Sequence, residues 1–257
     1  MRYHRKSLGI VILGCQRPHC LLNLLSSLTV QNKDMQYPIH IFLDIPYSSQ
    51  NMKYHISCIK LINEVFPQAQ CVVVDKHYST AVMMIDIIMP FMISEYQQII
   101  FIEDDSFLCK NALSQFTQCL KTLPPKTLSV YGDCGNQHPY SFHGIMWGTR
   151  QKVLTLVYSI LYKCHKDPVF KMKFINKNKD KFLKHFPGAK EYRLLTDKDF
   201  FEWGAMTWFI ATVLDLKHQR TPSITVYHTG VDDLSMHLKK IQKSKRDIHD
   251  REAWLYF

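Results

Sequence analysis

The chain has 257 residues, a formal net charge of +10 and 46% hydrophobic residues. This apolar content excludes a mainly disordered chain, and the length allows one large domain with a substantial core. The positive charge favours anionic partners such as phosphates, nucleic acid, acidic glycans or lipid head groups, without choosing among them.

Short apolar runs alternate with longer helical patterns in the first half of the chain. We expect strands over residues 8–14, 39–44, 71–75 and 98–104. Helices are expected between them, over residues 18–28, 54–66 and 79–95. Continuously apolar strands separated by helices predict an α/β fold with a mixed, mainly parallel sheet covered by helices on both faces.

The second half is less regular. Strand or loop pieces are expected at 128–135 and 144–148, helices at 150–162 and 199–216, and a late strand at 223–230. A lysine-rich stretch, 163–193, reads as a solvated face or loop, with a dedicated binding patch as the alternative, and a basic amphipathic tail covers 238–250. No repeat or linker is visible, so we expect a single domain over 1–257, with halves 1–105 and 106–257.

The cysteines and the apolar runs bear on the cellular compartment in which we expect the protein. Eight cysteines are scattered without a C-x-x-C pair and read as reduced core residues. The apolar stretch near the N-terminus is too short for a signal peptide, and no window approaches eighteen uninterrupted apolar residues. We therefore expect a cytoplasmic protein without a transmembrane segment, with peripheral membrane contact as an option.

Polar residues follow the ends of all four predicted strands. They are Arg17, Asp44, Asp75, His77 and the run Glu103-Asp104-Asp105. Ligands of open α/β sheets bind beyond the carboxyl ends of the strands, so these residues predict a ligand site at one edge of the sheet.

The run "FIEDDSF" places three carboxylates at the end of an apolar strand, where they would repel one another if left unpaired. A hard divalent cation such as Mg²⁺ or Mn²⁺ would resolve this repulsion and could bridge to a diphosphate. The alternative is a helix N-cap made by Asp105 or Ser106. The nine glycines form neither G-x-x-x-x-G-K-[ST] nor G-x-G-x-x-G, which argues against P-loop NTPases and Rossmann dehydrogenases.

The segments "ILGCQRP", "IFLD", "KHYSTAVMMIDIIM" and "FIEDDSFLCKNALSQF" resemble, in order and spacing, the GT-A-fold glycosyltransferases, and among them N-acetylglucosaminyltransferase I and its relatives. The pieces "FFEW" and "YHTG" extend the resemblance into the second half, on shorter strings. In this chain Ser79 and Thr80 replace the R-W that follows H-Y in that family, and a Glu stands where the family has an Asp as its base.

This resemblance implies a role for each matching position. It implies that the nucleotide sugar is bound by Gly14, Arg17, Asp44, His77, Glu103 and Asp104. It makes Asp105 the ligand of Mn²⁺ or Mg²⁺ and Glu202 the catalytic base, with Asp199 as the substitute. Trp147 and Trp203 would line the acceptor site, and His228, beside Gly230, would lie near the phosphates. As plain sequence features, His77 reads equally as a structural histidine and Glu202 as a polar residue on an exposed helix face.

The implied activity is a metal-dependent, inverting transfer from a UDP-sugar to a hydroxyl of a glycan or glycoconjugate, without nucleic acid as a partner. A microbial or viral enzyme on the cytoplasmic side, including a host cytoplasm, would fit the expected lack of a membrane anchor. Two rival readings remain: a basic protein that binds nucleic acid or an anionic surface and uses the acidic run only as a helix cap, and a metal-dependent phosphotransferase or nuclease.

Overall fold

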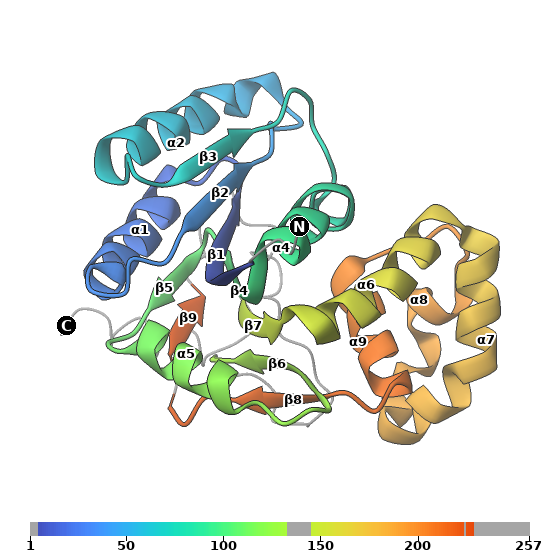
Figure 1. The fold of residues 1–257 in the computed structure, drawn as a ribbon. Helices are drawn as coiled ribbons and strands as arrows, with labels where there is room; N and C mark the ends of the chain where they lie inside the picture. Colours follow the sequence, from blue (N-terminus) through green and yellow to red (C-terminus); the bar gives the residue numbers. More distant parts are fainter. Residues whose placement is uncertain (1–4, 133–144, 224, 229–257) are drawn as a thin grey trace.

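A seven-stranded sheet forms the centre of the protein (Figure 1). The computed structural model describes residues 5–132, 145–223 and 225–228, and the strand order is β3-β2-β1-β4-β7-β6-β8. The strands are β1 (Lys6–Gly14), β2 (Ile39–Leu43), β3 (Gln70–Val73), β4 (Tyr96–Glu103), β6 (Thr127–Tyr131), β7 (Met146–Arg150) and β8 (Lys217–Arg220). Among the described strands of this sheet, β7 alone runs antiparallel to its neighbours, which confirms a mixed, mainly parallel sheet.

Helices cover both faces of the sheet. They are α1 (Pro18–Asn32), η1 (Ser49–Asn51), α2 (Met52–Val65), α3 (Thr80–Val82), the π-helix η2 (Met83–Ile88), α4 (Met89–Glu95), α5 (Ala112–Thr122), α6 (Gln151–Lys166), α7 (Pro168–His185), η3 (Pro187–Glu191), α8 (Arg193–Thr196) and α9 (Trp203–Val213). Side chains alternate between the faces of a strand, so Ile10 and Ile12 pack in the core under α1, α2 and α5. Val11 packs on the opposite face, with η2, α4, α6 and α9.

Prolines and caps explain where several helices begin. Pro18 and Pro168 occupy the first turns of α1 and α7, where a missing N–H costs nothing. The Asp167 side chain caps α7 by accepting hydrogen bonds from the N–H groups of Val169 (2.8 Å) and Phe170 (2.9 Å). The expected helix over 79–95 is confirmed, with one wide π turn in its middle.

Three expectations for the second half need correction. The helix expected at 199–216 begins only at Trp203, because Asp197 accepts hydrogen bonds from the N–H groups of Asp199 and Phe200 and holds a turn there. The lysine-rich stretch contains the helix α7, so the alternative of a loop is wrong there, whereas the expected solvated face is confirmed by the exposed lysines of this helix. The late strand begins only at Val226: β9 (Val226–His228) pairs with β5 (Ser106–Leu108) in a separate two-stranded sheet, and the expected end at 229–230 lies outside the described residues.

Some expectations concern residues that the structure does not describe: Cys134, Gly230, the ends of the strand pieces at 133–135 and 144, and the tail at 238–250.

The seven other cysteines are free thiols, and burial raises the pKa of Cys15, Cys58 and Cys164 to about 12. None of the helices in the described ranges combines the length and apolar character needed to cross a bilayer.

Candidate active site

The sheet changes its winding direction between β1 and β4. From β1 the chain moves outward to β2 and β3, and then returns to β4 on the other side of β1 (Figure 1). The carboxyl ends of β1 and β4 stay paired, since the Asp104 N–H donates to the Leu13 carbonyl at 3.0 Å. Open α/β sheets bind ligands in the crevice that forms at such a switch point.

A cluster of one guanidinium and two carboxylates occupies this switch point. Arg17 donates through Nη2 to Asp104 Oδ1 and through Nη1 to Asp105 Oδ2. The Cys15 N–H donates to the other Asp104 oxygen at 3.4 Å. Asp104 and Asp105 are each only 1% exposed, whereas the Arg17 side chain retains 20% exposure. The arginine thus lies between the buried carboxylates and the outside.

Gly14 leaves room for this cluster. A Cβ atom at that position would lie 3.0 Å from Asp104 Oδ2 and 3.1 Å from Asp104 Cβ. Its role in the structure is therefore to let β1 end close to the Asp104 side chain.

Burial and charge act on this cluster in opposite directions. Asp104 and Asp105 both pair with the Arg17 guanidinium in a buried place. Burial raises the pKa of Asp104 to about 6, and the attraction of Arg17 only partly offsets this rise. For Arg17, burial works to lower the pKa, but Asp104 and Asp105 raise it further above its usual range, so the guanidinium stays charged.

A second polar group lies at the end of the neighbouring strand β2. The Asp44 carboxylate accepts a hydrogen bond from the Tyr78 N–H at 2.8 Å and lies 3.3 Å from Nδ1 of His77. The same His77 nitrogen is 2.7 Å from the Ile45 carbonyl oxygen. Burial raises the pKa of Asp44, and the contacts with Tyr78 and His77 oppose the rise. The structure therefore brings together two of the residues that sequence reasoning placed at one edge.

The helix-cap reading of the acidic run is wrong. Residues 104–105 form a turn, and the short strand β5 follows directly at Ser106. The next helix, α5, begins at Ala112, with Asn111 in its N-cap position. The buried carboxylates therefore do not cap a helix, and among the described residues both pair with Arg17.

Comparison with solved structures finds similar architectures at low identity. S. aureus TarS (residues 1–349) has a TM-score of 0.46 and 10% identity, over 92% of this chain and 66% of that one. The mannosyltransferase PcManGT from Pyrobaculum calidifontis, in complex with GDP-Man and Mn²⁺, has a TM-score of 0.43 and 10% identity, over 82% of this chain and 70% of that one. Mouse xyloside xylosyltransferase 1 has a TM-score of 0.46 and 11% identity, over 87% of this chain and 97% of that one. No protein-family model and no curated protein sequence matches the chain.

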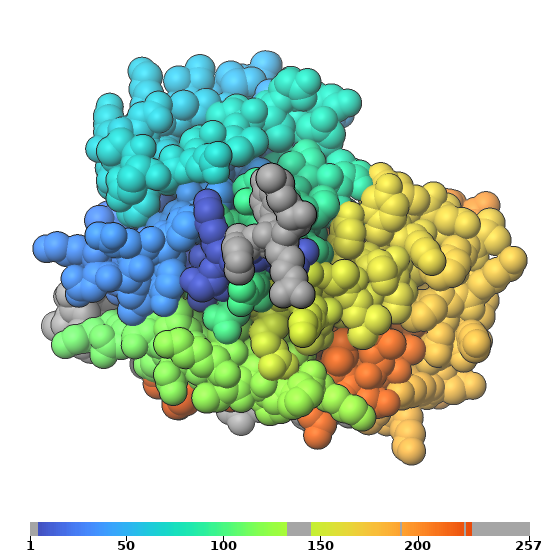
Figure 2. All heavy atoms as spheres, in the orientation of Figure 1, coloured from blue at the N-terminus to red at the C-terminus, as the bar shows by residue number. Residues whose placement is uncertain are grey.

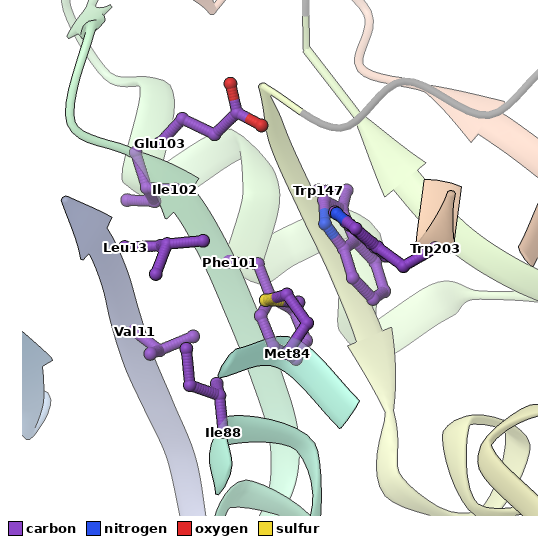
Figure 3. A pocket seen from close by; sticks show the side chains of 9 residues that line it. All are labelled: Val11, Leu13, Met84, Ile88, Phe101, Ile102, Glu103, Trp147 and Trp203. Carbon is purple, nitrogen blue, oxygen red and sulfur yellow. The ribbon is translucent and has the colours of Figure 1, made fainter. Parts of the chain in front are cut away.

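An apolar pocket lies beside the switch point (Figure 3). It is lined by Val11, Leu13, Met84, Ile88, Phe101, Ile102, Glu103, Trp147 and Trp203. Glu103 is its one carboxylate, and Trp147 and Trp203 lie with ring centres 6.3 Å apart. Trp147 is fully buried and stacks on Phe101 at 4.2 Å, and Trp203 is 7% exposed. In this structure both indoles therefore support the pocket wall and offer little open ring face.

Glu202 caps α9 instead of lying on an exposed face of a longer helix. Its carboxylate accepts hydrogen bonds from the N–H groups of Gly204 (2.8 Å) and Ala205. The cap fixes the carboxylate next to Trp203, and Trp203 lines the same pocket as Glu103. Asp199 lies in the exposed turn before the cap.

A buried lysine that the sequence analysis overlooked supports this turn. Lys171 of α7 is 1% exposed, and its ammonium donates to the carbonyl oxygens of Asp197 (2.9 Å), Lys198 (2.7 Å) and Phe200 (2.7 Å). A helical pattern could have indicated it, because Lys171 lies four residues before the buried Ile175. Burial lowers the pKa of Lys171, against the opposing pull of Asp197 and Asp199.

The backbone of His228 lies next to the segment that carries Asp105. Strand β9 pairs with β5 so that His228 lies opposite Ser106, the residue after Asp105. Its side chain is outside what the structure describes. Among the described residues, no group of three or more His, Cys, Asp or Glu side chains could hold a metal ion.

Proposed function

We propose that the chain is a glycosyltransferase that moves a sugar from a nucleoside-diphosphate sugar, a UDP-sugar, to a hydroxyl of a glycan or glycoconjugate. The observation that carries this proposal is the cluster of Arg17, Asp104 and Asp105 at the switch point between β1 and β4. Nucleotides bind at this point of open α/β sheets. The lack of both glycine-rich nucleotide motifs disfavours the P-loop and dinucleotide alternatives.

The donor would lie across the ends of β1, β2 and β4. Asp44 and His77, which lie together at the end of β2, would contact the nucleoside, and the partly exposed Arg17 would contact the diphosphate. Asp104 would face the ribose or the sugar, with Glu103 at the neighbouring pocket. A guanidinium suits this task because it binds phosphate oxygens in a bidentate way and keeps its charge.

The donor set fits a divalent cation, Mn²⁺ or Mg²⁺. Such ions use one or two carboxylates together with phosphate oxygens and water, not a cage made wholly of protein, and Asp104 and Asp105 supply two adjacent buried carboxylates. Asp105 would hold the ion, with Asp104 beside it. When bound, the ion would neutralise the charge that develops on the leaving diphosphate.

The protein groups would carry the proton transfer. Glu202 would take the proton of the acceptor hydroxyl while the acceptor oxygen forms its bond to the anomeric carbon. The bond from that carbon to the diphosphate oxygen breaks with its electron pair, and the nucleoside diphosphate leaves. One displacement from the opposite side inverts the configuration. The cap bonds at the start of α9 would orient Glu202 for this step.

Donor binding is tested by replacing Asp105 with Asn. We expect UDP with Mn²⁺ to raise the melting temperature of the wild-type protein, because a ligand that binds only the folded state stabilises it. In the Asp105→Asn protein this increase should disappear. Asp34→Asn, at an exposed position, is the control and should respond like wild type. A wild-type protein that ignores UDP with and without Mn²⁺ would contradict the proposal, and full transfer activity in EDTA would remove the metal from it.

The base is tested by comparing Glu202→Gln with Asp199→Asn. Glutamine keeps one cap acceptor but cannot take the proton, so we expect kcat to fall by about 10²- to 10⁴-fold with donor binding unchanged. Steady-state kinetics with UDP-sugars would measure the effect. The opposite pattern, a slow Asp199→Asn and a normal Glu202→Gln, would assign the base to Asp199. Product analysis separates a transferase from a metal-dependent phosphotransferase, because only the transferase releases UDP and a glycosylated acceptor.

A further inference from the structure

The positive charge of the chain is concentrated in one part of the fold. Residues 151–190, which form α6, α7 and most of η3, contain ten lysines and two aspartates. This segment therefore supplies a net charge of +8, out of +10 for the whole chain. Helices α6 and α7 pack on one another and, in yellow to gold, form the right-hand flank of the molecule in Figure 2.

Helix α7 directs a row of lysines away from the core. Lys173, Lys177 and Lys184 are exposed, and their spacing of four and seven residues places them on one face. The opposite face contains Ile175 and Phe182, both buried. The helix is therefore amphipathic, with a basic outer face.

Helix α6 adds lysines and exposed apolar side chains. Lys152 and Lys163 are exposed, as are Leu156 (49%) and Tyr162 (42%). Val169, at the start of α7, is 63% exposed. The exposed sides of the two helices thus carry both basic and apolar side chains.

Most of these lysines lack an acidic partner. Seven are exposed and form no ion pair within the described residues: Lys152, Lys163, Lys173, Lys177, Lys179, Lys184 and Lys190. Lys166 and Lys181 differ, since they pair with Asp86 and Asp215, respectively. The seven unpaired charges remain available to an external anion.

We propose that the outer faces of α6 and α7 form a docking surface for an anionic lipid bilayer. The charge is complementary to acidic head groups, and each lysine near such a surface adds to the attraction. The exposed Leu156, Tyr162 and Val169 favour a bilayer over nucleic acid, because a membrane interface accepts apolar and tyrosine side chains among the lysines. None of the residues named on this surface belongs to the candidate active site, so this proposal does not depend on the proposed reaction.

Vesicle sedimentation with the full chain tests the proposal. We expect the protein to sediment with phosphatidylcholine vesicles that contain phosphatidylserine, and not with phosphatidylcholine alone. Removing four charges with Lys163→Gln, Lys173→Gln, Lys177→Gln and Lys184→Gln should lower the partition coefficient on the order of a thousandfold. High salt should have a similar effect, because it screens exposed charges.

Two further variants distinguish the alternatives. A control that removes Lys33, Lys60, Lys110 and Lys121, all exposed on other elements, should sediment like wild type. Leu156→Ser with Tyr162→Ser keeps every charge and should still weaken vesicle binding. The proposal would be overturned if the control variant lost as much vesicle binding as the α6–α7 variant, or if the wild-type protein did not sediment with the vesicles. Tighter binding to duplex DNA or RNA than to the vesicles would also overturn it. The charge variants should melt like wild type, since the lysines replaced are exposed.

Discussion

Replacing Arg17 with Met is expected to lower the free energy of unfolding by about 3–5 kcal/mol near neutral pH. The substitution leaves Asp104 and Asp105, each 1% exposed, without the guanidinium that pairs with both. Uncompensated charge in a buried place is among the most destabilising changes known in proteins. Urea denaturation with EDTA present would measure the loss without interference from metal ions.

The loss of stability caused by Arg17→Met should depend on pH, and the pKa of Asp104 determines whether this loss grows or shrinks as the pH rises. Its pKa is about 6 in the folded chain against an ordinary 3.8, so its contribution to stability is present below about pH 4 and is lost as the pH rises through 6. Removing Arg17 raises this pKa further, since Arg17 holds it down. The variant should therefore recover part of its deficit at about pH 5. Arg5→Met, on an exposed side chain, is the control, and an equal loss there would contradict the assignment.

Replacing Lys171 with Met should destabilise the protein by a similar amount, about 3–5 kcal/mol. Methionine fills most of the space but leaves the carbonyl oxygens of Asp197, Lys198 and Phe200 without the ammonium that now satisfies them. Thermal and urea unfolding would measure the effect. Since this turn leads into Glu202, the fluorescence of the neighbouring Trp203 should also change.

Lys173 provides a matched control for Lys171. It lies two residues further along the same helix and is exposed. Lys173→Met should change the free energy of unfolding by only about 0.5 kcal/mol or less. If both substitutions have the same small effect, the ammonium of Lys171 is not what holds residues 197–200 in place.

Local signals predicted most of the sheet and one edge of the site. The runs around Ile10, Ile41 and Ile100 are apolar and short, and they form the parallel strands expected of them. Parallel strands carry their carboxyl ends to the same edge, so Arg17 and Asp104 could be placed near each other before any contact was known.

Other features depend on contacts that no local pattern contains. Strand β8 is short and polar, and it forms because β6 offers it a parallel edge. Glu202 looked like part of a long helix, but the turn held by Asp197 and Lys171 makes it a cap instead.

The sequence by itself determined the order of strands and helices over residues 6–103, the edge of the sheet that carries the polar residues, and the basic character of residues 163–193. Only the tertiary structure decided that Arg17 bridges both aspartates and that Lys171 is buried beneath the turn before α9. The physical reason is distance along the chain. The hydrophobic periodicity of a helix or strand involves residues only a few positions apart. The partner of a buried charge can lie far away in the sequence, and the two aspartates that pair with Arg17 are 87 and 88 residues from it.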